Sequence, residues 1–264
     1  MRMQAMFESQ AGSFDLAVLL TPLALAAVVI YFTAGVVKGT LGIGFPTTAV
    51  SLMAQMTDAR TAISLVVIPM LVTNAWQVWR NRRVRWVLSS FWLLILLMLV
   101  FIGIFSQVAT LVPIALLTAT LGLIVSLYAA TSLYRPVISI SDTYDKPAQI
   151  ITGITSGAMG GVAGVWAPPL LIYLNARKLT KEQFVSTTGV FLFLGSCILI
   201  LGYSNAGLLG GAILTMSCLL LIPSMAGFTA GELIRNRLSA KRFERVLLWF
   251  FLIMGLNLIR RSFV

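Results

Sequence analysis

The chain has 264 residues, of which 59% are hydrophobic and 10% charged. Charged residues make up about a quarter of ordinary soluble domains, so this composition excludes a water-soluble fold. The net charge of +11 does not indicate nucleic-acid binding, because Lys and Arg lie in short loops between apolar segments. The sequence has no histidine and eight acidic residues, all in or beside polar breaks. This excludes intramembrane proteolysis and a proton relay through buried carboxylates.

The first half of the chain begins with an apolar segment that is long enough for two helices. It covers residues 16–56 and carries one charge, that of Lys38. Segments close to the roughly 20 residues that cross a bilayer follow it. We therefore predict a first repeat, residues 1–134, with a hairpin at 16–56 and spans at 61–79, 86–105 and 112–134.

The second half repeats this plan after a polar linker at 135–146, which we expect to be cytoplasmic. Its last apolar segment is short and relies on Arg245 and Arg260 reaching the membrane surfaces from its two ends. We predict a second repeat, residues 147–264, with a hairpin at 147–176 and spans at 183–203, 207–231 and 246–259. Hydropathy alone gives seven to eight apolar segments.

Two glycine-rich motifs support the duplication. At an offset of 122 residues, Gly35, Gly39, Gly42 and Pro46 correspond to Gly157, Gly161, Gly164 and Pro168. Glycine costs a helix about 1 kcal/mol and an interior proline about 3 kcal/mol, so two such motifs need a physical reason. One reason is close helix packing through small residues four apart. The reason that we favour is a break at mid-membrane, after which Pro46 or Pro168 restarts a helix at its first position. Both can hold together.

The charges of the loops bear on topology. If every apolar segment crosses the membrane, Lys and Arg divide nine against nine, leaving Lys38 aside. If 16–56 and 147–176 are hairpins that enter and leave on one side, the division is fourteen against four, and the richer side is cytoplasmic. Making only the second segment re-entrant gives fifteen against three, so charge does not decide the first hairpin. The duplication favours two hairpins, one in each half. Each copy then has an odd number of crossings, which predicts an all-α, polytopic, inverted-repeat transporter with two helical hairpins and about six full crossings.

Lys38 is the only ionisable residue deep inside an apolar segment. A cation at the membrane centre costs about 2.5–3.5 kcal/mol and marks a functional site by default, although its long side chain can also reach the outer surface. Freed N–H groups at the breaks would favour an anion. The second copy has no matching cation, and Ser156 and Trp166 are its nearest polar groups. Asn74, Thr187 and Thr188 are more typical of hydrogen bonds between helices. The predicted substrate-binding residues are Lys38, Gly39, Thr40, Gly42, Gly44, Thr47, Asn74, Ser156, Gly160, Gly161, Trp166, Thr187 and Thr188.

The two motifs, AGVVKGTLGIGFP at 34–46 and GITSGAMGGVAGVWAPP at 153–169, resemble those of the sulfite exporter TauE/SafE family of small bacterial permeases. DARTA at 58–62 and GELIR at 231–235 extend the resemblance, which covers residues 31 to about 260. The resemblance implies transport of sulfite, sulfoacetate or a related organosulfonate across the bacterial inner membrane. It does not fix which of these anions is the substrate.

We therefore expect a secondary carrier that exports a small sulfur-containing anion by alternating access. A negative interior favours anion exit by about 2.3 kcal/mol per charge for each 100 mV, so export needs no coupled ion. An anion channel, a cation-coupled importer and a scaffold subunit are the alternatives. We expect no enzymatic activity, no cofactor, no metal and no nucleic acid. The expected partners are the anion and the lipid bilayer, and a homodimer is left open.

Overall fold

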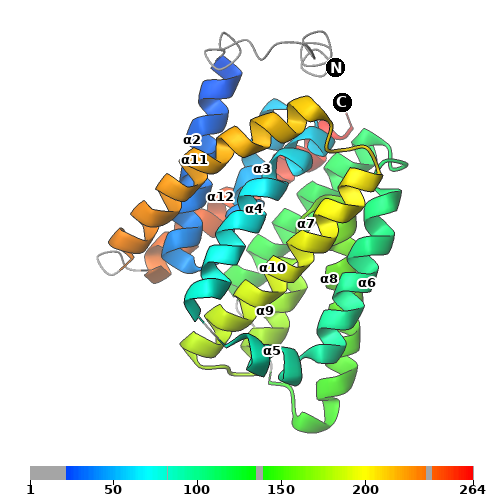
Figure 1. Ribbon diagram of the computed structural model, residues 1–264, viewed down its shortest axis with the longest axis vertical. Helices are drawn as coiled ribbons and strands as arrows, with labels where there is room; N and C mark the ends of the chain where they lie inside the picture. The colour runs from blue at the N-terminus through cyan, green and yellow to red at the C-terminus, as the bar shows by residue number, and fades with distance from the viewer. Residues whose placement is uncertain (1–21, 82, 135–138, 236–239, 264) are drawn as a thin grey trace.

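A computed structural model describes residues 22–81, 83–134, 139–235 and 240–263. The described residues form α-helices joined by short loops, with no strand among them (Figure 1). In chain order the helices are α2 (Pro22–Leu41), α3 (Phe45–Met56), α4 (Ala59–Asn81), α5 (Val84–Ser90), α6 (Trp92–Val108), α7 (Ile114–Tyr134), α8 (Asp145–Ala163), α9 (Ala167–Ala176), α10 (Lys181–Asn205), α11 (Gly211–Ile234) and α12 (Ala240–Arg261), with a 3₁₀ turn η2 (Asp142–Tyr144) before α8. The part of the predicted first hairpin before Pro22 lies outside the described residues.

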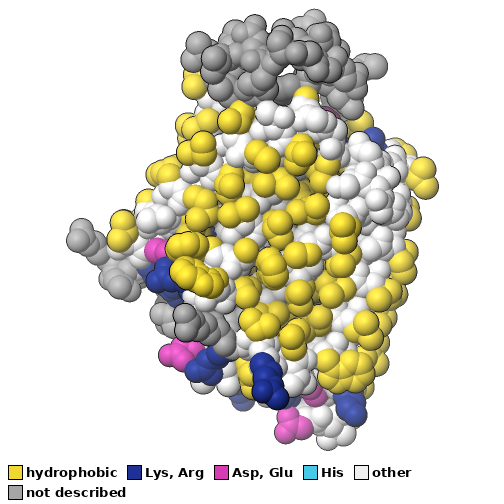
Figure 2. All heavy atoms as spheres, in the orientation of Figure 1, with side chains coloured by type: hydrophobic (Ala, Val, Ile, Leu, Met, Phe, Trp, Pro, Cys, Tyr) yellow, Lys and Arg dark blue, Asp and Glu magenta, His cyan; other side chains and the backbone are white. Residues whose placement is uncertain are grey.

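The helices are long and apolar enough for a membrane protein. Five of those described could cross a bilayer, namely α2, α4, α7, α10 and α11, and α5 with α6 makes a sixth if the bent pair is one span. Hydrophobic side chains cover the middle of the face seen in Figure 2, and charged side chains gather mainly at its lower end. The prediction of an all-α polytopic membrane protein is confirmed.

Both glycine motifs break a helix. Gly42 and Gly44, between α2 and α3, have φ of 80° and 92°, and Gly164, between α8 and α9, has φ of 65°. Side chains disfavour these backbone angles, so glycine lets the chain turn here. Pro46 and Pro168 are each the second residue of the helix that follows, one place later than predicted. Proline fits this second position as well as the first, because the second N–H of a helix also lacks an intrahelical partner and its absence costs no hydrogen bond.

The same motifs also pack helices closely. A Cβ atom on Gly39 would lie 2.1 Å from the carbonyl oxygen of Phe228 in α11, and one on Gly157 would lie 2.5 Å from Cβ of Phe101 in α6. No side chain fits at either position. The packing explanation and the helix-break explanation therefore both hold, for different glycines of each motif.

The two hairpins exchange partners between the halves of the chain. Hairpin helix α2 packs along α11, whereas hairpin helix α8 packs along α6. At the offset of 122 residues α2 corresponds to α8, and α11 corresponds to the segment of α5 and α6. In Figure 1, α2 starts at the top of the molecule and α8 at the bottom. Each half thus supplies the helix on which the hairpin of the other half rests.

The segment predicted as one span at 86–105 consists of two helices. α5 and α6 meet at 88° around Phe91. The Phe91 ring packs edge-on against Trp86, Tyr173 and Phe191, with ring centroids 5.8, 6.1 and 5.8 Å away. Three aromatic contacts from different elements stabilise this bend, and Ser89 and Ser90 directly before it are the break in the apolar sequence that the prediction of one span passed over.

Candidate functional site

Lys38 lies near the end of α2 and is fully buried. Its Nζ donates a hydrogen bond to Oδ1 of Asn74, a buried residue of α4. An ammonium can only donate, so the amide oxygen of Asn74 faces Lys38 and the amide nitrogen faces away. That nitrogen donates to Oγ of Ser196 in α10, at 3.2 Å. Lys38 therefore points into the protein between α4 and α10, and the alternative that it reaches the surface is excluded.

The charge of Lys38 has no acidic counterpart in this site. Among the buried residues of the described chain, Lys38 alone carries a charged side chain, and its hydrogen-bond acceptor is a neutral amide. A buried cation without a partner is costly, and a bound anion would offset that cost. The site is therefore suited to an anion.

Asn74 and Ser196 occupy corresponding places in the two halves, because they are 122 residues apart. A residue can bond to its own counterpart only close to the axis that relates two halves. The tips of the hairpins show the same relation. Gly42 lies beside Val185 of α10, and Gly164 lies beside Ile63 of α4, which is the position equivalent to Val185. Lys38 therefore reaches the axis at which the two halves meet.

The second hairpin contributes a tryptophan to the same region. Trp166 precedes α9 and is buried between α8 and α10. A Cβ atom on Gly160 would lie 3.0 Å from its ring atom Cε3, and one on Gly195 would lie 2.9 Å from its ring atoms Cε2 and Cζ2. Gly195 is next to Ser196 in α10, so the indole packs at the same level of α10 as the Lys38–Asn74–Ser196 chain of hydrogen bonds, on the adjoining side of the helix.

Among the described residues of the second half, three buried polar side-chain groups have no hydrogen-bond partner. They are the indole nitrogen of Trp166, the Ser156 hydroxyl of α8 and the Thr187 hydroxyl of α10. Thr187 lies on α10 between Val185, which meets the tip residue Gly42, and Gly189. Buried donors are nearly always paired in proteins, so these three are free to bind a polar ligand, as are the unpaired hydroxyls of Tyr31, Ser51 and Ser126 in the first half.

The remaining predicted site residues fall into two groups. Some pack against neighbouring helices. Gly39 and Thr40 of α2 lie against α11, and Oγ1 of Thr40 donates to the Val36 carbonyl of its own helix and to the Gly231 carbonyl of α11. Gly161 of α8 lies against α6. Others lie at a helix start or donate within their own helix. Gly44 caps the start of α3, and the buried Thr47 lies in its first turn. Thr188 of α10 donates to the Phe184 and Val185 carbonyls. The sequence interpretation missed Ser196, although its offset from Asn74 equals that of the glycine motifs.

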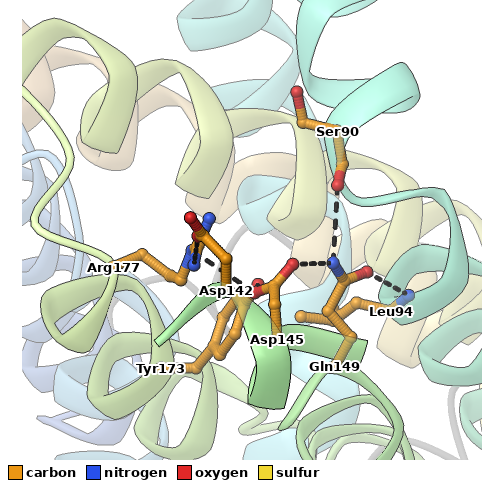
Figure 3. A network of polar contacts seen from close by, with 7 residues as sticks. All are labelled: Ser90, Leu94, Asp142, Asp145, Gln149, Tyr173 and Arg177. Carbon is orange, nitrogen blue, oxygen red and sulfur yellow. Dashed lines mark hydrogen bonds and ion pairs between the residues drawn. The ribbon is translucent and has the colours of Figure 1, made fainter. Parts of the chain in front are cut away.

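A second polar network closes the open end of the second hairpin (Figure 3). Asp145, at the start of α8, accepts hydrogen bonds from the Tyr173 hydroxyl at 2.7 Å and from Nε2 of Gln149 at 2.8 Å, and Nε of Arg177 lies 3.3 Å from it. Oε1 of Gln149 accepts from the backbone N–H of Leu94 at 3.4 Å. The network joins both helices of the hairpin to the α5–α6 bend.

Replacing Tyr173 by Phe is expected to lower the free energy of unfolding by about 1.5–3 kcal/mol, the usual worth of a hydrogen bond to a charged group. Thermal unfolding of the purified protein in detergent measures this. Tyr144→Phe is the matched control, because the Tyr144 side chain nearby is 68% exposed. Equal melting temperatures for the two variants would show that this hydrogen bond adds no stability.

The fold and the site together define a class of protein. A polytopic helical chain with two broken helices converging on a buried cation is a membrane protein of the broken-helix transporter type. The chain belongs to the sulfite exporter TauE/SafE family, whose family model matches residues 15–258. The resemblance carried by the two glycine motifs is thereby confirmed, and the family is one of membrane transporters. No curated protein and no solved structure gives a match to the chain.

Proposed function

We propose that the protein is a secondary carrier that exports a small sulfur-containing anion: sulfite, sulfoacetate or a related organosulfonate. The observation that carries the proposal is the fully buried ammonium of Lys38, which lies where the two halves meet and has a neutral amide as its acceptor. An oxyanion offers what this site lacks, a negative charge for Lys38 and an acceptor for the unpaired indole N–H of Trp166.

In this mechanism Asn74 takes the place of the substrate while the site is empty. Its amide oxygen accepts from Lys38 and keeps the ammonium hydrogen-bonded between the halves. An entering anion competes with the neutral oxygen for the same donor and wins through charge. The two repeats, 1–134 and 147–264, would then rock against each other about the site and expose it to one side at a time.

Replacing Asn74 by Asp is expected to reduce transport as strongly as loss of Lys38, by about a hundredfold, because a fixed carboxylate neutralises the ammonium and repels the anion. Asn74→Ser is the matched control, since it keeps a hydroxyl acceptor and adds no charge. Initial uptake rates in proteoliposomes measure both. Transport by the Asp variant at the rate of the Ser variant would contradict a direct role for the charge of Lys38.

We also propose that the end with most of the charges faces the cytoplasm, in the inner membrane. Arg80 pairs there with Glu232 at 2.7 Å and Arg83 with Glu182 at 3.0 Å, and most Lys and Arg of the chain lie in loops assigned to that side. The excess of positive charge would draw anions to this face from solution. A negative interior then drives them outward with no coupled ion.

Cysteine labelling tests this orientation. In a background without Cys197 and Cys218, Leu111→Cys is expected to react with an impermeant reagent in intact spheroplasts. Tyr144→Cys should react only after permeabilisation. Both side chains are well exposed, at 78% and 68%. Leu111 follows the end of α6 and Tyr144 precedes the start of α8, and these two helices run side by side in the same direction, so the two residues lie at opposite ends. The reverse pattern would place the basic end outside and contradict the proposed sidedness.

Flux measurements in proteoliposomes test the function. We expect saturable uptake of sulfite or an organosulfonate, accelerated by the same anion on the opposite side and by a potential of the right sign. Taurine and acetate serve as comparison solutes. Saturation without acceleration from the opposite side favours a channel, and dependence on Na⁺ or a proton gradient favours a coupled importer. Absence of flux for every anion would overturn the proposal and leave a scaffold role.

A further inference from the structure

The two hairpin tips differ at two corresponding positions. At the offset of 122 residues Lys38 corresponds to Gly160, and Gly44 corresponds to Trp166. Each half therefore has one large buried side chain and one glycine at these two positions, but in opposite order. The first half has Lys38 and then Gly44, and the second half has Gly160 and then Trp166. In the second half the indole packs directly on Gly160, where a Cβ atom would lie 3.0 Å from Cβ of Trp166. A neutral ring in the second tip thus replaces the cation of the first.

The site consequently offers a single positive charge. Lys38 is the one charged side chain among the buried residues that the structure describes, and the other polar groups around it are hydroxyls, an amide and an indole. These can donate hydrogen bonds but neutralise no charge. Arg60 is not a second cation for the site, because it lies at the beginning of α4, about 20 Å of helix rise from Asn74, and its guanidinium donates to the Thr110 and Val112 carbonyls at 3.1 and 2.8 Å.

Three of the arginines at the charged end are paired with acidic side chains. Arg80 pairs with Glu232, Arg83 with Glu182, and Arg177 with Asp142 at 2.9 Å. These arginines can attract anions to the charged end of the protein, but they do not lie beside Lys38, where the two halves meet. An anion with two charges would therefore leave one charge uncompensated in the protein interior, where an unpaired charge is strongly disfavoured.

Resting on the proposed function, we infer that the site selects its substrate by charge: it takes monovalent oxyanions, and Gly160 and Trp166 set this limit by withholding a second cation. Among the sulfur anions, alkanesulfonates and hydrogensulfite fit the site. Sulfate, the sulfite dianion and sulfoacetate, which is a dianion at neutral pH, do not. The inference therefore narrows the candidates of the proposed function to hydrogensulfite and organosulfonates with a single charge. The indole also offers an apolar surface to the alkyl group of a sulfonate.

The decisive measurement compares anions of fixed charge at one pH. The full-length protein in proteoliposomes is expected to transport methanesulfonate and ethanesulfonate faster than sulfate and ethanedisulfonate by roughly a hundredfold, the effect of leaving one buried charge without a partner. Sulfite transport should fall from slightly acidic to slightly alkaline pH as hydrogensulfite loses its proton. Methanesulfonate, which keeps its charge over this range, controls for titration of the protein itself.

The outcomes separate this inference from the function on which it rests. Equal transport of monovalent and divalent anions overturns the charge limit and leaves the proposed carrier intact. Absence of transport for all of them overturns both. Sulfite transport that follows the change seen with methanesulfonate also contradicts the charge limit, because the dianion would then be carried as well as hydrogensulfite.

A paired substitution tests the role of the second tip. Gly160→Lys with Trp166→Gly gives this tip the residues that the first one has, and it is expected to raise sulfate transport towards that of methanesulfonate. Trp166→Phe is the control, since it keeps the ring and adds no charge, and it should stay selective. A folded double variant that still rejects sulfate overturns the assignment to Gly160 and Trp166. If the double variant does not fold, the wild-type comparison decides the charge limit alone.

Discussion

Lys38→Met is expected to reduce transport of the substrate anion by about a hundredfold, because truncating one partner of a buried charge pair costs about 2–5 kcal/mol and each 1.4 kcal/mol is a factor of ten. Methionine has nearly the shape of lysine and no charge. Since it also removes a buried ammonium, the variant should fold at least as stably as the wild type. Initial rates in proteoliposomes, together with thermal unfolding of the same preparation, measure both effects.

Lys38→Arg is the matched control. It keeps the charge but spreads it over a planar group that does not fit the place of an ammonium, so we expect weakened transport above the Met level. Undiminished transport by a well-folded Met variant would contradict a role for the cation in binding. It would favour the interpretation in which the glycine motifs only pack helices.

Gly39→Ala is expected to lower the free energy of unfolding by about 1–3 kcal/mol, the usual cost of overpacking a filled interior. The added Cβ atom would lie 2.1 Å from the Phe228 carbonyl oxygen and 2.8 Å from the Glu232 nitrogen. Both are backbone atoms that cannot move aside unless α2 and α11 separate. Thermal unfolding in detergent, followed by fluorescence, measures the loss.

Two further glycines make this result specific. Gly161→Ala should behave in the same way, because its Cβ atom would lie 2.8 Å from the Ile102 carbonyl oxygen of α6. Gly211→Ala should leave stability unchanged or slightly raised, since nothing lies within 4 Å of that position. Equal stability of the Gly39 and Gly211 variants would contradict the close contact between α2 and α11.

Much of this architecture is predictable from sequence because strong physical constraints limit which residues can occupy each position. Bilayer thickness sets the apolar lengths, and glycines that turn the backbone must be glycines, as Gly42 and Gly164 show. The α5–α6 bend is different. It depends on where the Phe91 ring packs against residues distant in the chain, and the only local sign of it is the Ser89–Ser90 pair, which does not give the angle.

The candidate site divides in the same way. Lys38 is conspicuous in an apolar segment, and its buried position was open to prediction. Ser196 was missed because a serine within an apolar helix is not distinctive by itself, and only its offset of 122 residues from Asn74 singles it out. Gly39 and Gly44 belong to one motif, yet the first packs on α11 and the second begins α3. Spacing alone cannot separate these two uses of glycine, because both require the absence of a side chain.

The exchange of helix partners has a consequence for synthesis. Helix α2 emerges from the ribosome long before α11, the helix on which it packs. At about 5–20 residues per second, roughly 10 to 35 s separate the two. Throughout that interval the bare glycine face of α2 has no partner from its own chain. Newly made protein is therefore exposed to degradation until its second half arrives, and the N-terminal half should become stable only when the C-terminal half is made in the same cell.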